Sequence, residues 1–548
     1  MELQTVKNIS RLTDILVILV KYGFEDIVEK IKFPGLSLFR KEKAKPVESS
    51  SFERIRMVLE ELGTTFVKMG QVLSMRPDLV PPPLLKELQK LQDTVPPENF
   101  DAVRIQIEQN LGNSLEEIFT QFNPIPISAG SVAQVHYAVL KENNREVAVK
   151  VQRPDIQEII REDLNILAFV ASQVHKHLDT CQPYDLPAIV REVRSAMLYE
   201  LDFSLESRNM DIFRINFSGN PKIHIPEVFS RWTTGTVLTM EYIAGTKLQN
   251  LPIDYPYRAE LALIGIYAIL QQILKDGFFH ADPHSGNILV MKDNRLCFLD
   301  FGMVGVLTED MKFALIDLFE AFLNRDSKQI VKISLQISEY DAGINKMELE
   351  RDVLRLVFQI DPTIARAHIG KSLMELGQIL KTHNVRIPVV YFMIFKTIIT
   401  AESLAVLLYS ECRIWDEARP FLEEIARARL HPALLMKEMS HNLADTSRFL
   451  RLFPGRLENL FRRIEEQKIA FLFRHQGLES LTQSLENVSN RISFSIIIGS
   501  LIIGSSLIIT TGISPLLFGF PVLGIIGFFI SGFMGIWLTI NMIKRKKL

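Results

Sequence analysis

Two acidic residues and an asparagine lie close together in the middle of the chain, in an order that suits metal-dependent phosphoryl transfer. Asp282 and Asn287 stand in one short stretch, His-Ala-Asp-Pro-His-Ser-Gly-Asn, and Asp300 begins an Asp-Phe-Gly soon after it. Phosphoryl transfer needs oxygen ligands for Mg²⁺ and a polar group near the attacking oxygen. An Asp-Phe-Gly alone could be any turn, but the three residues in this order predict a phosphoryl-transfer site.

The preceding part of the chain supplies two further groups that such a site requires. The small-residue loop Ser128–Ser131 could cover phosphates, and Lys150, which closes a Val-Ala-Val-Lys strand, could contact them. Taken singly, a small-residue loop is usually a turn, and a lysine that ends a strand is usually solvated. Because the loop and the lysine precede Asp282, Asn287 and Asp300 in the order that a nucleotide site requires, a nucleotide site is favoured over a simple turn and a solvated lysine.

Strand patterns predict how the loop and the lysine are held. Val132–Leu140 alternates between apolar and polar residues and is followed by a polar turn and a second strand, Val147–Val151, so we expect a hairpin. Thr236–Ile243 predicts a further strand. Helical patterns are strongest in three segments, Asp163–Met210, Tyr257–Gly277 and Met311–Leu323.

An amphipathic helix is predicted nearer the N-terminus. Within Phe52–Leu73, apolar residues recur at steps of three and four, and a series of prolines begins at Pro77. Lys68 and Gln71 lie off the apolar stripe, about one turn apart. Gly70 inside this helix costs about 1 kcal/mol relative to alanine, which indicates close packing against another element. From the helix alone, Lys68 would be interpreted as an exposed surface lysine.

The C-terminal region is typical of a membrane anchor. No charged residue or histidine occurs between Arg491 and Lys544. A helix needs about 20 apolar residues to cross a bilayer, so this run predicts two spans, Ile492–Gly512 and Leu516–Ile543, with a turn at Pro515. The alternative is an apolar hairpin buried in a soluble protein. Small residues on one face of the second span would allow the helices to pack closely: Gly527, Ser531 and Gly535.

Composition limits the class of protein. The chain has 548 residues, of which 47% are hydrophobic, so two or more folding units are expected. A formal net charge of −2 argues against a dedicated nucleic-acid-binding protein. Cys181, Cys297 and Cys412 are far apart in the sequence, so neither a zinc site nor a disulfide framework is expected.

The chain resembles the UbiB/AarF family of atypical kinase-like proteins, the ADCK-type group, over residues 50 to about 440. The resemblance implies an α+β fold: a bilobal protein-kinase-like fold with an N-terminal helical extension and a C-terminal two-helix transmembrane hairpin. The length and the hairpin are similar to those of bacterial members linked to ubiquinone biosynthesis. Three strings carry the resemblance: Lys68-Met-Gly-Gln71, Glu200-Leu-Asp202 and the Asp282–Asn287 loop.

The resemblance implies a role for each residue of the nucleotide site. Lys150 would hold the α- and β-phosphates of ATP and pair with Glu206, because a carboxylate can orient a flexible ammonium. Asp300 and Asn287 would bind Mg²⁺, and Asp282 occupies the position of the catalytic-loop aspartate. The remaining cofactor-binding residues belong to the small-residue loop and to the hinge that binds adenine: Ala129, Gly130, Ser131, Met240, Glu241 and Tyr242.

A cover over the substrate side is also implied by the resemblance. The helix with Lys68 and Gln71 would lie where a protein kinase admits its peptide substrate, and Lys68 would pair with Glu200 or Asp202. The chain also lacks a GxGxxG loop and has His-Ala-Asp where protein kinases have His-Arg-Asp. These features disfavour phosphorylation of proteins.

Two hypotheses of function therefore stand ahead of a true protein kinase. The first is a membrane-anchored, atypical kinase-like ATPase that supports ubiquinone biosynthesis, with Mg-ATP, a membrane lipid or quinone precursor and biosynthetic enzymes as its partners. The second is a catalytically silent, nucleotide-binding scaffold for membrane enzymes.

The expected location is the inner (cytoplasmic) membrane, in a multi-pass topology with the kinase-like body in the cytoplasm. The basic tail after Ile543 supports this orientation, because positive residues near span ends tend to stay cytoplasmic. The expected segments are residues 1–120 as helical extension, 121–250 as N-lobe, 251–450 as helical C-lobe, 451–491 as amphipathic stalk, 492–543 as two transmembrane helices and 544–548 as basic tail.

Overall fold

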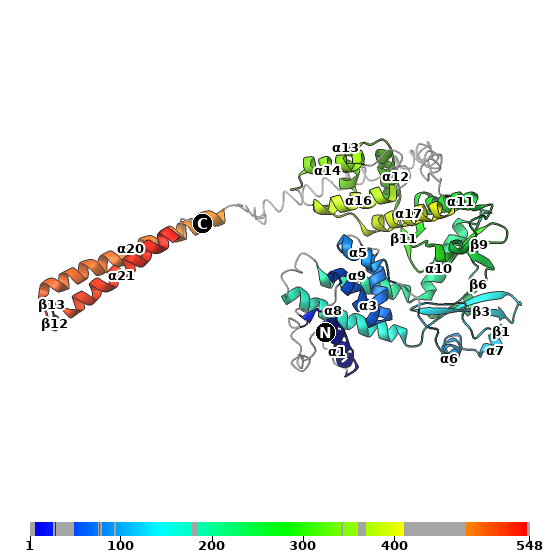
Figure 1. Ribbon diagram of the computed structural model, residues 1–548, viewed down its shortest axis with the longest axis horizontal. Coiled ribbons are helices and arrows are strands. Elements are labelled where there is room, and N and C mark those ends of the chain that lie inside the picture. Colours follow the sequence, from blue (N-terminus) through cyan, green and yellow to red (C-terminus); the bar gives the residue numbers. More distant parts are fainter. Residues whose placement is uncertain are drawn as a thin grey trace, which may run out of the picture. The chain divides into compact units, whose positions relative to one another are not determined.

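The computed structural model describes residues 6–25, 28, 49–74, 76, 79–91, 95–177, 185–340, 343–359, 369–409 and 478–544. The chain divides into two compact units, Met1–Leu435 and Met436–Leu548, each with its own internal packing (Figure 1). The first unit, called the body below, contains all of the predicted site residues. Cys181, Cys412, the basic tail after Lys544 and most of the predicted stalk lie outside the described residues.

A five-stranded antiparallel sheet forms one lobe of the body. Its order is β1-β3-β4-β6, and β2 also pairs with β3. The predicted hairpin is present as β3 and β4, and the predicted third strand is β6. The register places Lys150 between Val135 and Leu238, so its backbone is fixed within the sheet. The strands are β1 Phe119–Phe122, β2 Ser128–Ala129, β3 Ala133–Leu140, β4 Glu146–Gln152 and β6 Val237–Glu241.

Three helices follow β4: α8 (Ile156–His177), α9 (Leu186–Glu200) and α10 (Phe203–Asn216). Helices α8 and α9 contact each other, and α10 contacts both α9 and β6. The pair α8 and α9 therefore fills most of the 56-residue separation between Lys150 and Glu206.

The N-terminal helices within residues 6–88 share a second hydrophobic core with α8 and α9, whereas the two helices within residues 100–118 pack against the five-stranded sheet. The prediction of one helix over Phe52–Leu73 is wrong. Helix α3 ends at Leu62 and α4 begins at Thr64, because Gly63 between them has a positive φ of 96°. The helices of this region are α1 Val6–Lys21, α3 Ser51–Leu62, α4 Thr64–Ser74, α5 Pro82–Leu88, α6 Phe100–Leu111 and α7 Leu115–Ile118.

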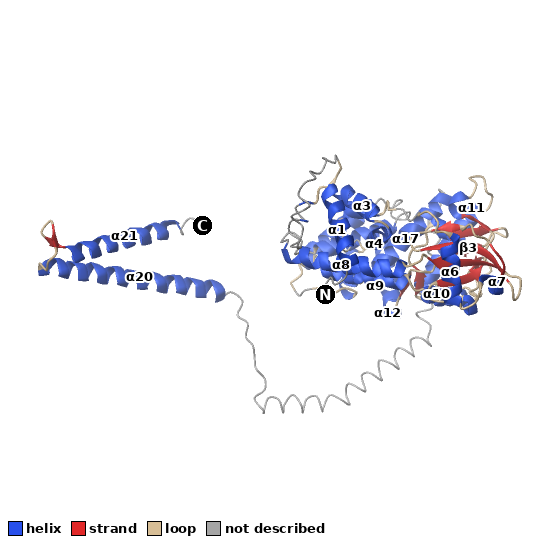
Figure 2. Cartoon of the chain, turned by 90° about the horizontal axis from the view of Figure 1, so that it is seen from below, coloured by secondary structure: helices blue, strands red, loops and turns tan. Residues whose placement is uncertain are grey.

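The second lobe is mostly helical and carries short strands beside the site. One sheet has the order β5-β10-β9-β7, and β8 pairs with β11. The predicted helix Tyr257–Gly277 is present as α11 (Arg258–Leu270) followed by a π-helical turn, Gln271–Asp276. Figure 2 shows the strands gathered at one end of the body, with α1, α3, α4, α8 and α9 at the other. The remaining elements are β5 Ile223–His224, β7 Gly245–Lys247, β8 Phe278–His280, β9 Ile288–Met291, β10 Leu296–Phe298, β11 Val304–Val306, α12 Glu309–Leu323, α13 Ser327–Gln336, α14 Lys346–Gln359, α16 Ile369–Thr382 and α17 Val389–Leu408.

The described part of the second unit contains two long helices, α20 (Leu478–Thr511) and α21 (Val522–Lys544), that contact each other. The predicted start of the second helix at Leu516 is wrong. Leu516–Leu517 (β12) and Phe520–Pro521 (β13) form a small hairpin around Gly519, which has a φ of 85°. By length and composition, Ile492–Thr511 and Val522–Thr539 could cross a membrane. Helix α17 is also long and apolar enough to cross a membrane, but 56% of its apolar stretch is buried inside the body.

Small residues bring α20 and α21 together, although not all of the predicted ones do. A Cβ atom on Gly527 would lie 2.2 Å from Ser505 Oγ, and one on Gly524 would lie 2.6 Å from an α20 side chain. Ser531 is buried. Within the described part of the chain, no atom of α20 lies within 4 Å of a Cβ on Gly535, so its predicted place in the close contact is wrong. The face of α21 that meets α20 instead contains Gly524, which was not predicted from the sequence.

The close packing predicted at Gly70 is confirmed. A Cβ there would lie 2.3 Å from Leu91 Cδ1 and 3.1 Å from Leu59 Cδ1. We expect Gly70→Leu to destabilise the body by about 1–3 kcal/mol, because it overfills the space between α3, α4 and α5. Thermal unfolding of the purified full-length protein measures this as a lower Tm. Gly219→Leu is the control, because open space surrounds Gly219. An equal Tm for the two variants would contradict the packing argument.

Candidate functional site

Helix α10 presents Glu206 to Lys150 on β4. Lys150 Nζ lies 2.8 Å from both Oε1 and Oε2 of Glu206, whose side chain is only 4% exposed. The same Nζ lies 5.0 Å from the centre of the Phe203 ring. Helix α10 starts where it does because the Asp202 side chain caps it and accepts a hydrogen bond from Ser204 N at 3.0 Å. The cap therefore fixes the start of α10, about one turn before Glu206.

The same helix also holds the Asp-Phe-Gly segment. Asn209, one turn after Glu206, donates from Nδ2 to Phe301 O at 2.9 Å. The Phe301 ring is fully buried, with its centre 4.8 Å from that of Phe213 on α10. Asn209 and Phe213 thus fix Phe301 while Glu206 fixes the lysine, so one helix aligns both parts of the site.

Asp300 lies between Lys150 and the metal-ligand candidate Asn287. Its backbone has a φ of 55°, and its Oδ1 accepts a hydrogen bond from Gly302 N at 3.3 Å. Oδ1 lies 3.7 Å from Lys150 Nζ, and Oδ2 lies 3.5 Å from Asn287 Nδ2. The structure therefore brings together the lysine and both predicted metal ligands.

The neighbouring charges shift the pKa values of this group. Lys150 holds the pKa of the Asp300 carboxyl well below its usual range against the opposing effect of burial, and Lys68 lowers it further. Burial acts to lower the pKa of Lys150, but Asp300 and Glu206 together raise it above its ordinary value. Burial raises the pKa of Glu206, and Lys150 opposes that shift. Lys150 and Asp300 are therefore both charged at neutral pH.

The donor set fits Mg²⁺. Asp300 offers a carboxylate that stays ionised, and Asn287 offers an amide oxygen at the end of the short helical turn Ser285–Asn287. Among the described residues, no group of three or more His, Cys, Asp and Glu side chains comes together. Two protein ligands are typical of Mg²⁺ in nucleotide sites, where phosphates and water supply the others.

Asp282 begins the loop that follows β8. His280 Nδ1 accepts a hydrogen bond from Asp282 N at 3.1 Å, so its Nε2–H faces Leu299 O at 3.3 Å. Burial lowers the pKa of His280, which keeps the imidazole neutral in this role. His280 also pairs with Val304 across β8 and β11. The loop is therefore tied to the segment that follows Asp-Phe-Gly.

Helix α17 adds a residue that the sequence analysis missed. Lys396 Nζ donates to Asp282 Oδ1 at 3.1 Å. The next residue, Thr397, is buried, and its Oγ1 donates to Ala281 O at 3.2 Å. A lone lysine inside an otherwise apolar stretch, Val-Val-Tyr-Phe-Met-Ile-Phe-Lys, was the available signal. Such a lysine is costly to bury without a partner.

The predicted phosphate loop is a tight turn at the start of β3. Ala129 pairs with Gln134, Gly130 N donates to Ala133 O at 2.8 Å, and Ser131 is buried. Arg153 donates from Nε to Gly130 O at 2.9 Å. The loop is therefore fixed by backbone pairing and by one arginine.

The predicted hinge lies where the chain leaves the five-stranded sheet. Strand β6 ends at Glu241, and β7 of the second lobe begins at Gly245. Met240 is buried, and the Tyr242 ring packs edge-on against Tyr137. The Glu241 carboxylate accepts from Glu227 N and lies 2.9 Å from His224 Nε2. Its side chain is thus used within the fold, which leaves the backbone of this segment as the candidate adenine contact.

The cover residues lie on α4 and at the end of α9. Glu200 and Asp202 were the predicted partners of Lys68, and in the structure Lys68 pairs with Glu200. Asp202 instead caps α10. Gln71 is half-buried, one turn after Lys68 on α4. Helix α4 contacts α9, so the cover is part of the packing of the body.

Comparisons with known proteins agree with this architecture. The chain matches the ABC1 atypical kinase-like domain over residues 90–334, the UbiB helical domain over 358–413 and the ABC1/UbiB kinase-like C-terminal domain over 476–544. The first of these ranges contains Lys150, Glu206, Asp282 and Asp300. Helix α17 with Lys396 lies in the second.

Full-length relatives are also similar. A protein from the hydrogenase 1 5′ region of Clostridium pasteurianum is 31% identical, over 98% of this chain and 99% of its own. A probable protein kinase UbiB of Aeromonas salmonicida is 34% identical, over 78% of this chain and 81% of its own. A solved chain, Rv3197 of Mycobacterium tuberculosis in complex with erythromycin, is 22% identical with a TM-score of 0.46, and covers 66% of this chain and 93% of its own.

The predicted mixed helix-and-strand, kinase-like fold of the body is confirmed by the domain match together with the two lobes. The membrane crossing of α20 and α21 stays a prediction. Because a relative more than 30% identical aligns over more than two thirds of both chains, and because the kinase-like domain spans the assembled site, the chain belongs to the ABC1/UbiB family of atypical kinase-like proteins.

Proposed function

We propose that this protein is a membrane-anchored, Mg²⁺-dependent ATPase of the kinase-like type that supports ubiquinone biosynthesis. The single observation that carries the proposal is the contact of Lys150 with both Glu206 and Asp300. A lysine held in this way has its ammonium fixed where phosphates would lie, next to a carboxylate that can hold the metal. The names of the UbiB relatives support the biosynthetic role.

Each residue of the site has one task in this proposal. Mg²⁺, when bound, would neutralise charge that develops on the transferred phosphate. Asp300 and Asn287 hold the metal, and Lys150 holds the α- and β-phosphates in place. Asp282 orients the attacking oxygen and can accept its proton.

Lys396 supplements this set from the helical domain. Its ammonium holds the Asp282 carboxylate at 3.1 Å and adds a positive charge beside the reacting phosphate. The His-Ala-Asp motif lacks the arginine that protein kinases have in this loop. Lys396 and Thr397 of α17 fix the loop here instead.

The cover supports a substrate other than protein. Lys68 on α4 pairs with Glu200, and a Cβ atom on Gly302 would lie 3.6 Å from Glu200 Cγ, so α4 lies beside the Asp-Phe-Gly segment. A helix in that position would obstruct an extended peptide. A membrane lipid or quinone precursor is therefore the proposed substrate or effector, and quinone-biosynthesis enzymes are the proposed protein partners.

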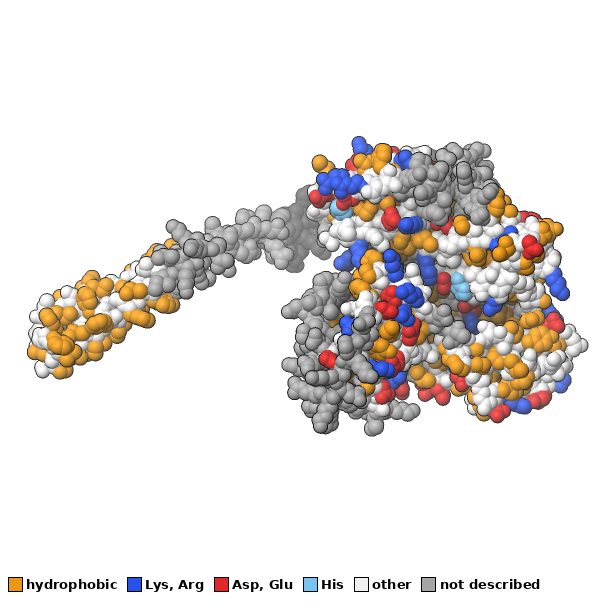
Figure 3. All heavy atoms as spheres, in the orientation of Figure 1, with side chains coloured by type: hydrophobic (Ala, Val, Ile, Leu, Met, Phe, Trp, Pro, Cys, Tyr) orange, Lys and Arg blue, Asp and Glu red, His pale blue; other side chains and the backbone are white. Residues whose placement is uncertain are grey.

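The C-terminal unit is the proposed membrane anchor, in the inner membrane and with the body in the cytoplasm. Its described helices carry mostly hydrophobic side chains on the surface seen in Figure 3. Large apolar side chains such as Ile503, Phe529 and Phe533 are 64%, 76% and 74% exposed. Exposed apolar surface of this extent is typical of contact with lipid.

A catalytically silent scaffold is the second candidate. The retained metal-ligand pair Asn287 and Asp300 and the retained Lys150 favour turnover over this alternative, because a scaffold does not need them. Phosphate release by the purified protein distinguishes the two functions.

Asp300→Asn keeps the size of the side chain and removes its charge. We expect Mg²⁺-dependent phosphate release to fall about 100-fold, because the metal loses its only charged protein ligand in this proposal. The assay uses the full-length protein in lipid nanodiscs. Asp293→Asn is the matched control, since Asp293 is 54% exposed and pairs with Arg295 in a turn. Undiminished phosphate release by the Asp300→Asn variant would contradict the assignment of Asp300 as a ligand of Mg²⁺.

Lys396→Met keeps the length of the side chain and removes the ammonium that holds Asp282. We expect kcat to fall at least tenfold with little change in the Kd for Mg-ATP, because Lys396 does not lie among the proposed nucleotide ligands. Lys396→Arg should restore part of kcat. Lys371→Met, at an exposed position of α16, is the control. A wild-type kcat in the Lys396→Met variant would contradict a role of Lys396 in turnover. A fall in kcat that is matched by a fall in Tm would also contradict it, because the loss would then come from instability.

A topology reporter tests the anchor. Two spans joined at β12 and β13 place both Arg491 and Lys544 on the same side as the body. We expect a fluorescent reporter fused after Leu548 to be active in the cytoplasm, and an alkaline phosphatase inserted at Gly519 to be active outside it. A C-terminus outside the cytoplasm would require an odd number of spans and would refute the two-span anchor.

A further inference from the structure

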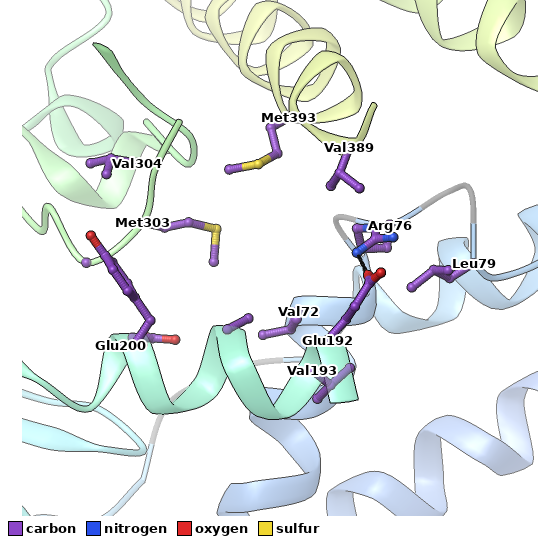
Figure 4. A pocket seen from close by; sticks show the side chains of 13 residues that line it. Val72, Arg76, Leu79, Glu192, Val193, Glu200, Met303, Val304, Val389 and Met393 are labelled. Atoms are coloured by element: carbon purple, nitrogen blue, oxygen red, sulfur yellow. Dashed lines mark hydrogen bonds and ion pairs between the residues drawn. The ribbon is translucent and has the colours of Figure 1, made fainter. Parts of the chain in front are cut away.

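The stretch of chain between α4 and β1 forms ion pairs with two later parts of the body. Arg76 pairs with Glu192 on α9, as the dashed line in Figure 4 shows, and this pair belongs to the packing of the cover. Glu98 pairs with Arg153, the residue that directly follows β4. The second pair lies beside the predicted phosphate loop, so it bears on the nucleotide site.

Arg153 connects the end of β4 to the phosphate loop and to the stretch before α6. It follows Lys150 by three residues, and its side chain is only 8% exposed. Its Nε donates to Gly130 O at 2.9 Å, its Nη1 to Glu98 Oε1 at 2.5 Å and its Nη2 to Pro96 O at 2.7 Å. Since a guanidinium is a planar fork of donors, three acceptors fix both its place and its orientation. One strand end therefore supplies the lysine proposed for the phosphates and the arginine that holds the loop.

The acceptors of Arg153 are themselves fixed to the five-stranded sheet. Glu98 N donates to Gln134 Oε1 at 2.9 Å, and Gln134 on β3 is buried. Helix α6, which begins soon after Glu98, contacts both β4 and β6. Gly130 N donates to Ala133 O at 2.8 Å, which ties the loop to the start of β3. Arg153 therefore joins two segments that already have defined places on the same sheet.

The loop depends on Arg153 for more than its fold. It contains one glycine and no GxGxxG, so it is held by hydrogen bonds rather than shaped around a ligand by several flexible residues. A loop that is ordered before binding loses less conformational freedom when a ligand arrives, which favours affinity. The bond from Arg153 to Gly130 O has a charged donor, and such bonds are stronger than neutral ones.

We propose that Arg153 is a positioning residue for nucleotide binding, which holds Gly130 O and keeps the turn Ser128–Ser131 in the conformation that contacts the phosphates of Mg-ATP. Glu98 is the second part of this arrangement, because it holds the guanidinium in place. The inference rests on the proposed function, in which phosphates lie beneath this turn. Arg153 acts through the loop, so it should affect the binding of phosphates and not the chemical step.

Arg153→Lys tests the proposal, because lysine keeps the charge but lacks the planar fork that reaches three acceptors. Ligand-observed NMR measures the Kd of Mg-ATP and of adenosine for the full-length protein in lipid nanodiscs. The two ligands share the base and the ribose, and only Mg-ATP carries phosphates. We expect the Kd for Mg-ATP to rise about tenfold, because the loop loses a charge-assisted hydrogen bond, and the Kd for adenosine to stay within about twofold.

Turnover provides a second measurement that a purely structural role would not move in the same way. The KM for ATP should rise with the Kd, whereas kcat at saturating Mg-ATP should stay within about twofold of the wild-type value. A residue that only stabilises the fold would lower Tm and weaken the binding of both ligands. Arg161→Lys is the matched control, because Arg161 is exposed on α8.

Glu98→Ala keeps the proposal testable if the Arg153→Lys variant does not fold. The Glu98 side chain is 37% exposed, and Arg153 keeps its two backbone acceptors in this variant, so the fold should tolerate the change. We expect the Kd for Mg-ATP to rise about threefold with no change for adenosine. An unchanged Kd for Mg-ATP in the variants that fold, or an equal rise in Kd for the two ligands, would overturn the proposal.

Phosphate release measured on the same samples separates this inference from the proposed function. A selective loss of Mg-ATP affinity in the Arg153→Lys variant, with no phosphate release by the wild type, would support the role of Arg153 and refute the ATPase. Phosphate release by the wild type, with an unchanged Kd for Mg-ATP in both variants, would refute the role of Arg153 and keep the ATPase. A wild type that does not bind Mg-ATP would refute both.

Discussion

The contact between Lys150 and Glu206 is the constraint around which the body is arranged. Both groups are largely removed from water, and an uncompensated buried charge costs several kcal/mol. Helix α10 must therefore deliver Glu206 to β4 accurately, although α8 and α9 intervene in the chain. The Asp202 cap and the packing of α10 on β6 provide that accuracy. Because Asn209 and Phe213 on the same helix hold Phe301, placing Glu206 also places Asp300.

The other charged residues of the site depend on elements outside the five-stranded sheet. Helix α4 brings Lys68 to Glu200, and α17 brings Lys396 to Asp282. Both elements lie outside the sheet, one among the N-terminal helices and the other in the helical domain. These regions therefore do more than support the fold, because each provides one lysine to the charge network of the site.

Sequence patterns predicted the parts of the site that depend on local order. The hairpin with Lys150 and the loops with Asp282 and Asp300 follow from alternation and from short motifs, so their positions could be assigned. The break at Gly63 could not be assigned, because the stripe of apolar residues continues through it and only the positive φ separates α3 from α4. A lone lysine in an apolar stretch indicates that Lys396 has a partner, but that partner is 114 residues away and no local pattern identifies it.

Where two similar residues could fill one role, the packing of the folded chain decides between them and the sequence does not. Glu200 and Asp202 are two residues apart, and either carboxylate could have met Lys68. The start of α10 requires a cap, which Asp202 provides, and Glu200 is then the carboxylate at the end of α9. Likewise, the phase of α21 against α20 places Gly524 and Gly527 in the contact and leaves Gly535 outside it. Which face of a helix meets its partner depends on both helices, so it cannot be read from the pattern of one helix alone.

The pairing of charges explains why Asp300 is the carboxylate suited to a metal. Each of three lysines has a dedicated carboxylate: Glu206 for Lys150, Glu200 for Lys68 and Asp282 for Lys396. Asp300 shares Lys150 at the longer distance of 3.7 Å. Its charge is thus stabilised by the surrounding lysines, which lower its pKa, without a short hydrogen bond to either of them. A carboxylate that is ionised and only loosely held can turn to a cation without giving up a close lysine partner, and the other three cannot.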